Sequence, residues 1–202
     1  MRVIGITGGI GSGKSTVADY LLYNYNAYVI ITDIIRVSLL LPGSDIYYSI
    51  LDIYGNDILL DGVSIDKDKL YSRIFNNSYE LRRYNEMVRP LLKERIQNTL
   101  EYFKSLECLD FIVIESATLF EDELDSLCSE IWYIHSDIKD RKIRLDLRGD
   151  LDKSVISNII SCQKMPSEFK KLCNKTINNS SDVNTLYRII DSLMWEVIIC
   201  FI

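Results

Sequence analysis

Short apolar runs alternate with longer amphipathic segments along most of the chain. Four of these runs are continuous and rich in β-branched residues, which is typical of parallel strands covered on both faces, and a shorter fifth run precedes the last amphipathic segment. The runs are residues 3–6, 27–31, 111–114, 131–134 and 176–177. Because strands that alternate with helices form parallel sheets with right-handed crossovers, we predict an α/β fold with a mostly parallel sheet of about five strands.

The first and last amphipathic segments have the periodicity of helices that bury one face. After the first strand, the residues on that face are Val17, Ala18, Leu21, Leu22 and Tyr25. In the last segment they are Val183, Leu186, Ile190, Leu193 and Val197. Ser181 or Asp182 is suited to cap the last helix, because a short polar side chain accepts a hydrogen bond from a free N–H of the first turn. We interpret the apolar residues 197–202 as the docked end of this helix.

Residues 64–104 interrupt the alternation, since they contain no strand candidate and carry helical patterning with many charges. Asp66 is suited to cap a helix that runs to Phe75, and a second helical segment runs from about residue 78 toward 104. Pro90 disfavours the α conformation of the residue before it, so we expect a break there. We interpret 64–104 as a helical lobe inserted into a single domain of residues 1–202. Its lysines and arginines suit an anionic substrate.

Composition and charge narrow the class of protein. The chain has 202 residues, of which 48% are hydrophobic and 26% charged, with 9 Gly and 3 Pro. These values exclude a collagen-like or wholly disordered chain, and the length suits one domain. The formal net charge of −6 makes nucleic acid a poor default partner, because the phosphate backbone repels an acidic surface.

The cysteines and the apolar runs bear on the compartment. The five cysteines, at positions 108, 128, 162, 173 and 200, have irregular spacing and form no C-x-x-C pair. This pattern argues against a disulfide framework or a zinc site, and we expect small buried side chains in a reducing compartment. No uncharged apolar run approaches the ~18 residues of a membrane span, and the N-terminus does not resemble a signal peptide. The sequence therefore predicts a cytoplasmic protein with no membrane partner.

The strongest chemical signal follows the first strand. Residues 8–15 read G-G-I-G-S-G-K-S, which matches the phosphate-loop pattern G-x-x-x-x-G-K-[ST] in the strand-to-helix setting that the pattern requires. Glycines let successive N–H groups turn toward phosphate oxygens, and the helix N-terminus favours an anion. We expect Lys14 at the β- and γ-phosphates and the Ser15 hydroxyl on Mg²⁺. The expected nucleotide-binding residues are Gly9, Gly11, Ser12, Gly13, Lys14, Ser15 and Thr16.

The loop predicts a nucleoside triphosphate but leaves the reaction open. A GTPase usually carries an N-K-x-D element, and the pair Asn174-Lys175 is followed by Thr176 and Ile177 instead. A small kinase with a helical substrate lobe fits the layout better than a mechanical ATPase, which usually needs a longer chain.

Several motifs follow one another in order. The loop reads T-G-G-I-G-S-G-K-S over residues 7–15, residues 29–33 read V-I-I-T-D, and residues 115–121 read E-S-A-T-L-F-E. The others are Pro42-Gly43, Tyr54-Gly55, Asp61-Gly62, residues 70–75, Arg144, Arg148, Gln163 and Ile177-Asn178. From Ile4 to about Asn178 this ordered set resembles the dephospho-coenzyme A kinases, which read V-I-D-A-D and D-V-P-L-L-F-E at the second and third of these places.

The resemblance implies a P-loop kinase core that transfers the γ-phosphoryl group of ATP to the ribose 3′-hydroxyl of dephospho-coenzyme A, the last step of coenzyme A synthesis. It implies that Mg²⁺, Lys14 and Arg144 offset charge during transfer, and that Asp33 orients the attacking hydroxyl and accepts its proton. It also implies that Arg148 binds ATP from a lid at 137–150. The residues that it places at the acceptor are Asp33, Lys67 and Arg89.

The chain departs from the family pattern at some of these positions. Ile31 replaces the first acid of D-A-D, so Asp33 carries that role alone, whereas Arg89 in place of His and Lys67 in place of Arg keep a positive charge. Glu115 keeps the charge of the family's Asp and is a candidate for the Mg²⁺ water shell. Two alternatives stay open: another small-molecule kinase, such as a nucleoside monophosphate kinase, and a non-catalytic nucleotide-binding module, which the loss of the acid at 31 favours. We expect a monomer or a small homo-oligomer.

Overall fold

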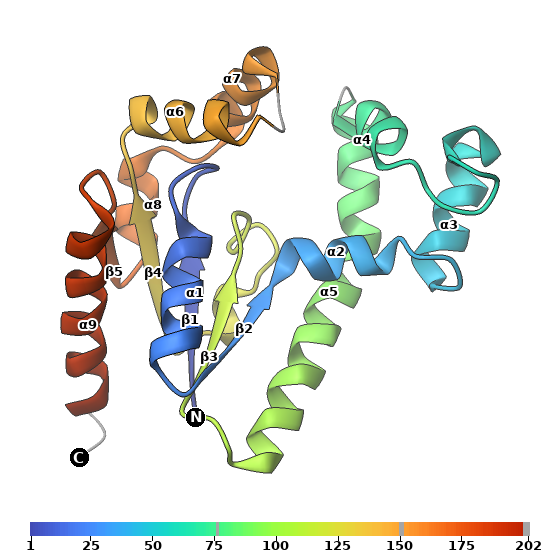
Figure 1. Ribbon diagram of the computed structural model, residues 1–202. Helices are drawn as coiled ribbons and strands as arrows, with labels where there is room; N and C mark the ends of the chain where they lie inside the picture. Colours follow the sequence, from blue (N-terminus) through green and yellow to red (C-terminus); the bar gives the residue numbers. More distant parts are fainter. Residues whose placement is uncertain (76, 150–151, 200–202) are drawn as a thin grey trace. The chain divides into compact units, whose positions relative to one another are not determined.

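The computed structural model describes residues 1–75, 77–149 and 152–199, and these form an α/β fold (Figure 1). The strands are β1 (Arg2–Thr7), β2 (Ala27–Ile31), β3 (Phe111–Glu115), β4 (Glu130–His135) and β5 (Lys175–Asn178). They form one sheet in the order β2-β3-β1-β4-β5, in which β1 pairs in parallel with β3 and β4, and β4 with β5. The predicted parallel sheet of about five strands is confirmed.

The described chain divides into two compact units, which we call the core unit and the helical unit. The core unit comprises residues 1–30 and 103–202, and the helical unit comprises residues 31–102. The inserted lobe that we predict at 64–104 falls largely in the helical unit, which begins 33 residues earlier, at Ile31 rather than at residue 64. The exact limits of the lobe stay a prediction.

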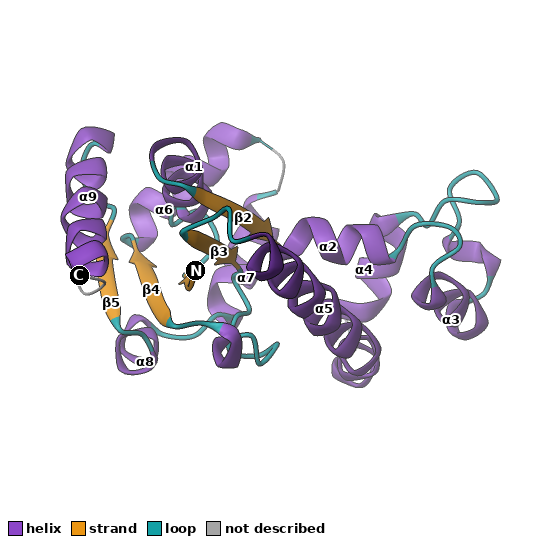
Figure 2. Ribbon diagram, turned by 90° about the horizontal axis from the view of Figure 1, so that it is seen from below, coloured by secondary structure: helices purple, strands orange, loops and turns teal. Residues whose placement is uncertain are grey.

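The helices of the core unit connect and flank the strands of the sheet. They are α1 (Lys14–Asn24), α6 (Ile138–Arg148), α7 (Lys153–Cys162), α8 (Pro166–Leu172), α9 (Val183–Ile199) and the short η2 (Asp125–Leu127). Figure 2 shows α1 and α8 on opposite sides of the strands. Val17 and Leu21 of α1 and Ile190 of α9 join Ile4 and Trp132 of the sheet in one buried cluster, which joins the first and last helices to the same face.

The register of the sheet brings the ends of distant strands together. Ile6 of β1 stands beside Glu115, the last residue of β3, and Thr7 stands beside Tyr133 of β4. His135, which ends β4, pairs with Asn178, which ends β5. Because the strands are parallel, the segments that follow β1, β3, β4 and β5 all leave from one edge of the sheet, where ligands of such folds bind.

The helical unit consists of α2 (Thr32–Leu39), α3 (Asp45–Tyr54), η1 (Asn56–Ile58), α4 (Lys67–Phe75) and most of α5 (Ser78–Leu106). Its buried side chains include Ile50, Ile58, Leu70, Ile74 and Val88. Asp66 caps α4 as predicted, because its Oδ1 accepts hydrogen bonds from the N–H groups of Asp68 at 3.1 Å and Lys69 at 3.2 Å.

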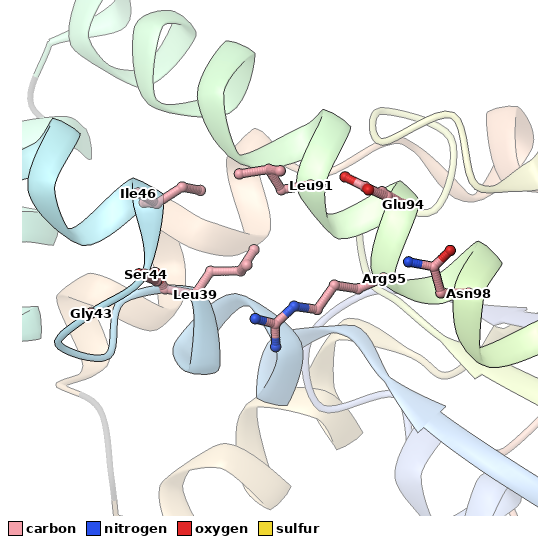
Figure 3. A pocket seen from close by; sticks show the side chains of 8 residues that line it. All are labelled: Leu39, Gly43, Ser44, Ile46, Leu91, Glu94, Arg95 and Asn98. Atoms are coloured by element: carbon pink, nitrogen blue, oxygen red, sulfur yellow. Dashed lines mark hydrogen bonds between the residues drawn. The ribbon is translucent and has the colours of Figure 1, made fainter.

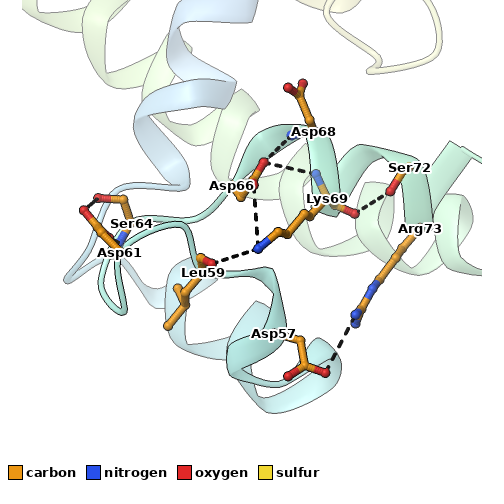
Figure 4. A network of polar contacts seen from close by, with 9 residues as sticks. All are labelled: Asp57, Leu59, Asp61, Ser64, Asp66, Asp68, Lys69, Ser72 and Arg73. Atoms are coloured by element: carbon orange, nitrogen blue, oxygen red, sulfur yellow. Dashed lines mark hydrogen bonds and ion pairs between the residues drawn. The ribbon is translucent and has the colours of Figure 1, made fainter.

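A polar network fastens α4 to the segment before it (Figure 4). The Lys69 ammonium donates to the Leu59 carbonyl at 3.1 Å and lies 3.8 Å from an Asp66 oxygen. Arg73 lies 3.9 Å from Asp57. Asp61 accepts hydrogen bonds from the backbone of the following turn, which hold the pKa of its carboxyl below the usual value. Two basic residues of the predicted lobe, Lys69 and Arg73, thus serve the local structure.

The predicted break in α5 is wrong. The helix runs from Ser78 to Leu106 with Pro90 inside it. A proline removes one backbone hydrogen bond and costs about 3 kcal/mol in a helix interior. Tyr84, Val88, Leu92 and Ile96 are buried on one face of this helix on both sides of the proline, and this packing offsets the cost.

Three burial predictions also need correction. At the first residue of α9, Val183 is 47% exposed and not on the buried face. On α1, Leu22 is 38% exposed, because the sheet covers only the narrower stripe of Val17, Ala18 and Leu21. Strand β2 is partly exposed rather than covered on both faces, because it lies at an edge of the sheet.

The expectation of buried cysteines is wrong for two of them. Cys108 and Cys162 are exposed and Cys128 and Cys173 half-buried; all four are free thiols. Residues 200–202, which include Cys200 and the end of the predicted docked helix, lie outside the described residues. Asp182 caps α9 as expected, accepting from the Thr185 N–H at 3.0 Å.

Asp191 joins α9 to α1. Its Oδ1 accepts hydrogen bonds from the phenols of Tyr20 at 2.9 Å and Tyr25 at 2.7 Å. Burial first, and then this hydrogen bond, raise the pKa of both phenols, so they remain donors at neutral pH. The ring of Tyr20 stacks on Tyr187 with centroids 4.0 Å apart.

We therefore predict that Asp191→Ala lowers the free energy of unfolding by about 2 kcal/mol, because two half-buried hydroxyl donors lose a charged acceptor. Asp19→Ala, at an exposed position of α1, is the matched control and should change stability little. Urea unfolding of the two variants beside wild type measures the difference. Equal midpoints for both variants would show that this contact does not hold α9 in place.

Candidate active site

The predicted phosphate loop lies between β1 and α1, in the place that its pattern requires. Gly13 immediately precedes α1 with φ 93°, and Gly11 has φ 74°; both values lie in the left-handed region that favours glycine. A Cβ on Gly13 would also collide with the amide nitrogen of Asn179. The loop therefore needs glycine at this position both for its backbone and for the close approach of a neighbouring side chain.

Lys14 and Ser15 begin helix α1, as the loop pattern predicts. The Lys14 side chain is 9% exposed and its ammonium donates to the Gly9 carbonyl at 3.3 Å, so the charge lies inside the curl of the loop. The Ser15 hydroxyl lies 3.4 Å from each carboxylate oxygen of Glu115, which is 8% exposed at the end of β3. The structure thus brings together a cation for phosphate and a pair of oxygen groups.

The pair formed by Ser15 and Glu115 fits Mg²⁺, which prefers oxygen ligands and commonly uses one or two protein groups beside substrate phosphates. The residues that the structure describes contain no group of three or more His, Cys, Asp or Glu able to form a metal cage. Glu115, which the sequence gives as a candidate for the Mg²⁺ water shell, lies beside Ser15 in the candidate site.

Side chains from outside the loop hold its carbonyl groups. The Arg144 guanidinium lies 3.4 Å from the carbonyl oxygens of Gly11 and Ser12 and donates to the Asn179 carbonyl at 2.7 Å. The buried amide of Asn179 donates to the Ser12 carbonyl at 2.8 Å. Because the C=O and N–H of a peptide point in opposite directions, carbonyls held from outside favour N–H groups that point inward.

A second pair of side chains binds the backbone carbonyl and N–H groups of Ile10, at the tip of the loop. The Arg141 guanidinium donates to the Ile10 carbonyl at 2.8 Å, and the Gln163 amide oxygen accepts from the Ile10 N–H at 3.1 Å. Arg141 also donates to Gln163, which closes the arrangement. Its guanidinium lies so close to Gly9 that a Cβ there would overlap it. We call Arg141, Gln163 and Ile10 the tip clamp.

The tip clamp was not predicted. The sequence analysis assigns no role to Arg141 and gives Gln163 only as part of the family resemblance. Burial lowers the pKa of the Arg141 guanidinium, which is half-buried and remains charged at neutral pH. The available signal was the spacing: Arg141 and Arg144 stand three residues apart and share a helix face as well as Arg144 and Arg148 do.

The remaining loop residues and Arg148 occupy different surroundings. Arg148 is exposed in the last turn of α6, and Thr16 is exposed in the first turn of α1. The buried hydroxyl of Ser12 has no hydrogen-bond partner within the described part of the chain, and it lies inside the predicted phosphate site. A ligand phosphate would supply an acceptor for that hydroxyl.

The residues predicted for the acceptor lie on three different helices of the helical unit. Asp33 is exposed in the first turn of α2, Lys67 is exposed at the first residue of α4, and Arg89 is half-buried in α5. Burial raises the pKa of the Tyr71 phenol on α4; a hydrogen bond with Tyr84 and the charge of Arg36 oppose the rise, and the Asp33 carboxylate adds to it. Tyr71 therefore lies within electrostatic range of Asp33, which the sequence does not reveal.

The chain is similar to known proteins. The family model of dephospho-CoA kinase matches residues 2–185. A dephospho-CoA kinase of Carboxydothermus hydrogenoformans is 31% identical over 185 residues, which cover 92% of this chain and 89% of that protein.

Two solved structures share the fold. A Thermus thermophilus protein superposes with a TM-score of 0.80 at 21% identity, over 96% of this chain and 97% of its own. A dephospho-CoA kinase from Campylobacter jejuni superposes with a TM-score of 0.69 at 18% identity, over 96% of each chain. At these identities the structural likeness shows the fold alone.

The tip clamp predicts coupled effects on nucleotide binding. Arg141→Met and Gln163→Leu should each raise the Kd of ATP about tenfold, because either change frees the loop tip, and the double variant should raise it little further. Lys142→Met, at the next and exposed position of α6, is the control and should bind ATP as wild type does. Isothermal titration gives the four constants. Two single effects that multiply, or none, would mean that the two side chains do not act as one clamp.

Proposed function

The chain belongs to the dephospho-CoA kinase family, and on that premise we propose which of its residues carry the transfer of a phosphoryl group from ATP to the ribose 3′-hydroxyl of dephospho-CoA. The protein is an ATP-dependent kinase of coenzyme A synthesis. The observation that carries the residue assignment is the phosphate loop, held from outside by Arg144 and Asn179, with Lys14 inside it.

The loop is proposed to bind the triphosphate. The phosphates are surrounded by positive charge from the backbone N–H groups of Gly9 and residues 11–16 and from the Lys14 ammonium. Arg144 is proposed to act from α6, where its contacts with the loop support a role in holding the loop as well as in offsetting charge during transfer. Arg148 is proposed to reach ATP from a lid at 137–150, of which residue 150 lies outside the described residues.

Ser15 and Glu115 are proposed to hold Mg²⁺ together with the nucleotide. When bound, the ion neutralises charge on the phosphates. Glu115 is buried at the end of a strand, so its carboxylate holds the Ser15 hydroxyl in position before the nucleotide arrives.

Asp33 is proposed to orient the ribose 3′-hydroxyl and to accept its proton, while Lys67 and Arg89 bind acceptor phosphates. A hydroxyl is a weak nucleophile because its pKa is high, so a carboxylate within hydrogen-bond reach contributes about 10²- to 10⁴-fold. The exposure of Asp33 supports this role, since the acid is open to a substrate, and so does its place directly after β2. With Ile31 in the first acidic position, Asp33 acts alone.

Compartment and assembly stay predictions. No helix within the described ranges is long and apolar enough to cross a membrane. We propose a reducing, cytoplasmic location for a protein with four free thiols among its described residues, and a monomer or small homo-oligomer.

An acceptor screen tests the activity. Purified protein with ATP and Mg²⁺ is offered dephospho-CoA, AMP, CMP and UMP, and ADP formation is followed. Rapid turnover with dephospho-CoA alone supports the proposal. Preferential turnover of a nucleoside monophosphate would favour the other kinase reading, and ATP binding with no turnover would favour a non-catalytic module.

Lys14→Ala should reduce turnover at least about 100-fold, because a preorganised positive charge next to the transferred group is lost. Lys139→Ala, at an exposed position of α6, removes the same charge outside the loop and should have little effect. Steady-state kinetics with thermal melting separates catalysis from folding. Near-normal turnover by a folded Lys14→Ala variant would remove the loop lysine from the reaction.

Asp33→Asn should lower kcat by roughly two orders of magnitude, since the amide keeps the shape but accepts no proton. The Kd of ATP should stay the same or fall slightly, because a negative charge is removed. Asp68→Asn is a matched control, an exposed acid in the first turn of α4. If Asp33 only caps its helix, Asn caps equally well and kcat stays unchanged. That outcome would end the catalytic assignment.

A further inference from the structure

The helical unit contains a cavity of about 340 Å³ (Figure 3). The residues that line it are separate in the sequence from the phosphate loop. One wall is the turn from α2 into α3, with Leu39, Gly43, Ser44 and Ile46. The other wall is one face of α5, formed by residues at positions i, i+3, i+4 and i+7: Leu91, Glu94, Arg95 and Asn98. The volume lies at the lower end of the range for small-molecule sites.

The lining suits a polar but uncharged ligand. Leu39, Ile46 and Leu91 supply apolar surface. Glu94 supplies acceptors, Arg95 donors and Asn98 both, while the opposite charges of Glu94 and Arg95 cancel. A phosphate would find no net positive charge here, in contrast to the loop. An amide-bearing chain would find apolar contact and hydrogen-bonding groups at once.

The second wall is held in place by a contact inside the unit. The Arg95 guanidinium donates to the Ser38 hydroxyl at 3.3 Å, which ties α5 to the last turn of α2. The Ser44 hydroxyl caps α3 by accepting from the Tyr47 N–H at 3.1 Å. Two residues of the lining, Arg95 and Ser44, are therefore held by contacts with other parts of the helical unit.

Helix α2 links this cavity to the proposed nucleophile-orienting acid. Asp33 lies in its first turn and Leu39 is its last residue. Six residues of α-helix rise about 9 Å. In dephospho-CoA the ribose carbons C3′, C4′ and C5′ and the diphosphate separate the reacting 3′-hydroxyl from the long amide-bearing arm. An acceptor whose hydroxyl is at Asp33 would thus have its arm at about this distance from it.

We propose that the cavity binds the pantetheine arm of dephospho-CoA. The inference rests on the proposed function and adds the part of the substrate that it leaves unassigned. The amide groups of the arm pair with Glu94, Arg95 and Asn98, and its dimethyl segment packs on Leu39, Ile46 and Leu91. The arm is the part that AMP and other nucleotides lack, so this contact selects dephospho-CoA among acceptors with a similar ribose.

Disulfide capture tests the site without requiring turnover. In Asn98→Cys, the introduced thiolate attacks the symmetric disulfide of dephospho-CoA, forms a mixed disulfide and releases one dephospho-CoA thiolate, with no net oxidation. Gln97→Cys, one position earlier on α5, exposed and outside the cavity lining, is the matched control. The native exposed Cys108 and Cys162 are internal controls.

We expect mass spectrometry to show capture at position 98 at least about tenfold faster than at 97, after division by the rates with hydroxyethyl disulfide to correct for thiol reactivity. AMP should not compete strongly, whereas pantethine should. Equal corrected rates at 97 and 98 would overturn the assignment.

Steady-state kinetics of a second variant provides an independent test. Leu91→Trp fills the cavity and should raise the KM for dephospho-CoA about tenfold while kcat and the KM for ATP change little, as expected for lost ground-state binding. Thermal melting shows whether the variant is folded, and Asn98→Leu replaces it if it is not. Unchanged KM for dephospho-CoA in a folded variant would overturn the inference even if wild type is active. If capture at position 98 is selective but the wild-type protein shows no turnover, the proposed function is overturned and the binding site stands.

Discussion

The carbonyl groups of Gly11 and Ser12 lie within hydrogen-bond reach of Arg144 and Asn179, and these contacts join parts of the chain that are more than 130 residues apart. A glycine-rich loop has many accessible conformations, so ordering it costs conformational entropy. Each contact contributes only about 1 kcal/mol, but together they hold the loop in one curl before the nucleotide arrives. Preorganised charge of this kind is the main source of catalysis in phosphoryl transfer.

The sheet makes these contacts possible. Because β1, β3, β4 and β5 are parallel, they end at the same edge of the sheet. Glu115 ends β3, and the loop, Ser136 and Asn179 directly follow β1, β4 and β5. Arg144 accordingly reaches Ser136 at 3.2 Å as well as the loop. A change in strand order would separate these groups without altering any of them, which is why the fold and the chemistry depend on each other here.

The sequence predicts what local pattern determines. Apolar runs predict the strands, and the spacing of glycines, lysine and serine predicts the phosphate loop. Asp66 and Asp182 are predicted as caps because the helices begin directly after them. It does not predict contacts between distant segments: Arg141 and Gln163 resemble ordinary surface residues until the fold brings both to Ile10. The continuous α5 was missed for a related reason, since tertiary packing of Val88 and Leu92 outweighs the local preference around Pro90. The exposure of β2 follows from its edge position, which no single run of residues encodes.

The proposed function gives the two units separate tasks, with the triphosphate at the loop of the core unit and the acceptor at the helical unit. Transfer without waste requires that the γ-phosphate react with the acceptor hydroxyl rather than with water. The most direct measurement is the ratio of coenzyme A formed to ATP consumed, with and without dephospho-CoA. The account predicts a ratio near one with the acceptor and only slow ATP loss without it. ATP consumption that is equally fast in both cases, or consumption that yields no coenzyme A, would contradict it.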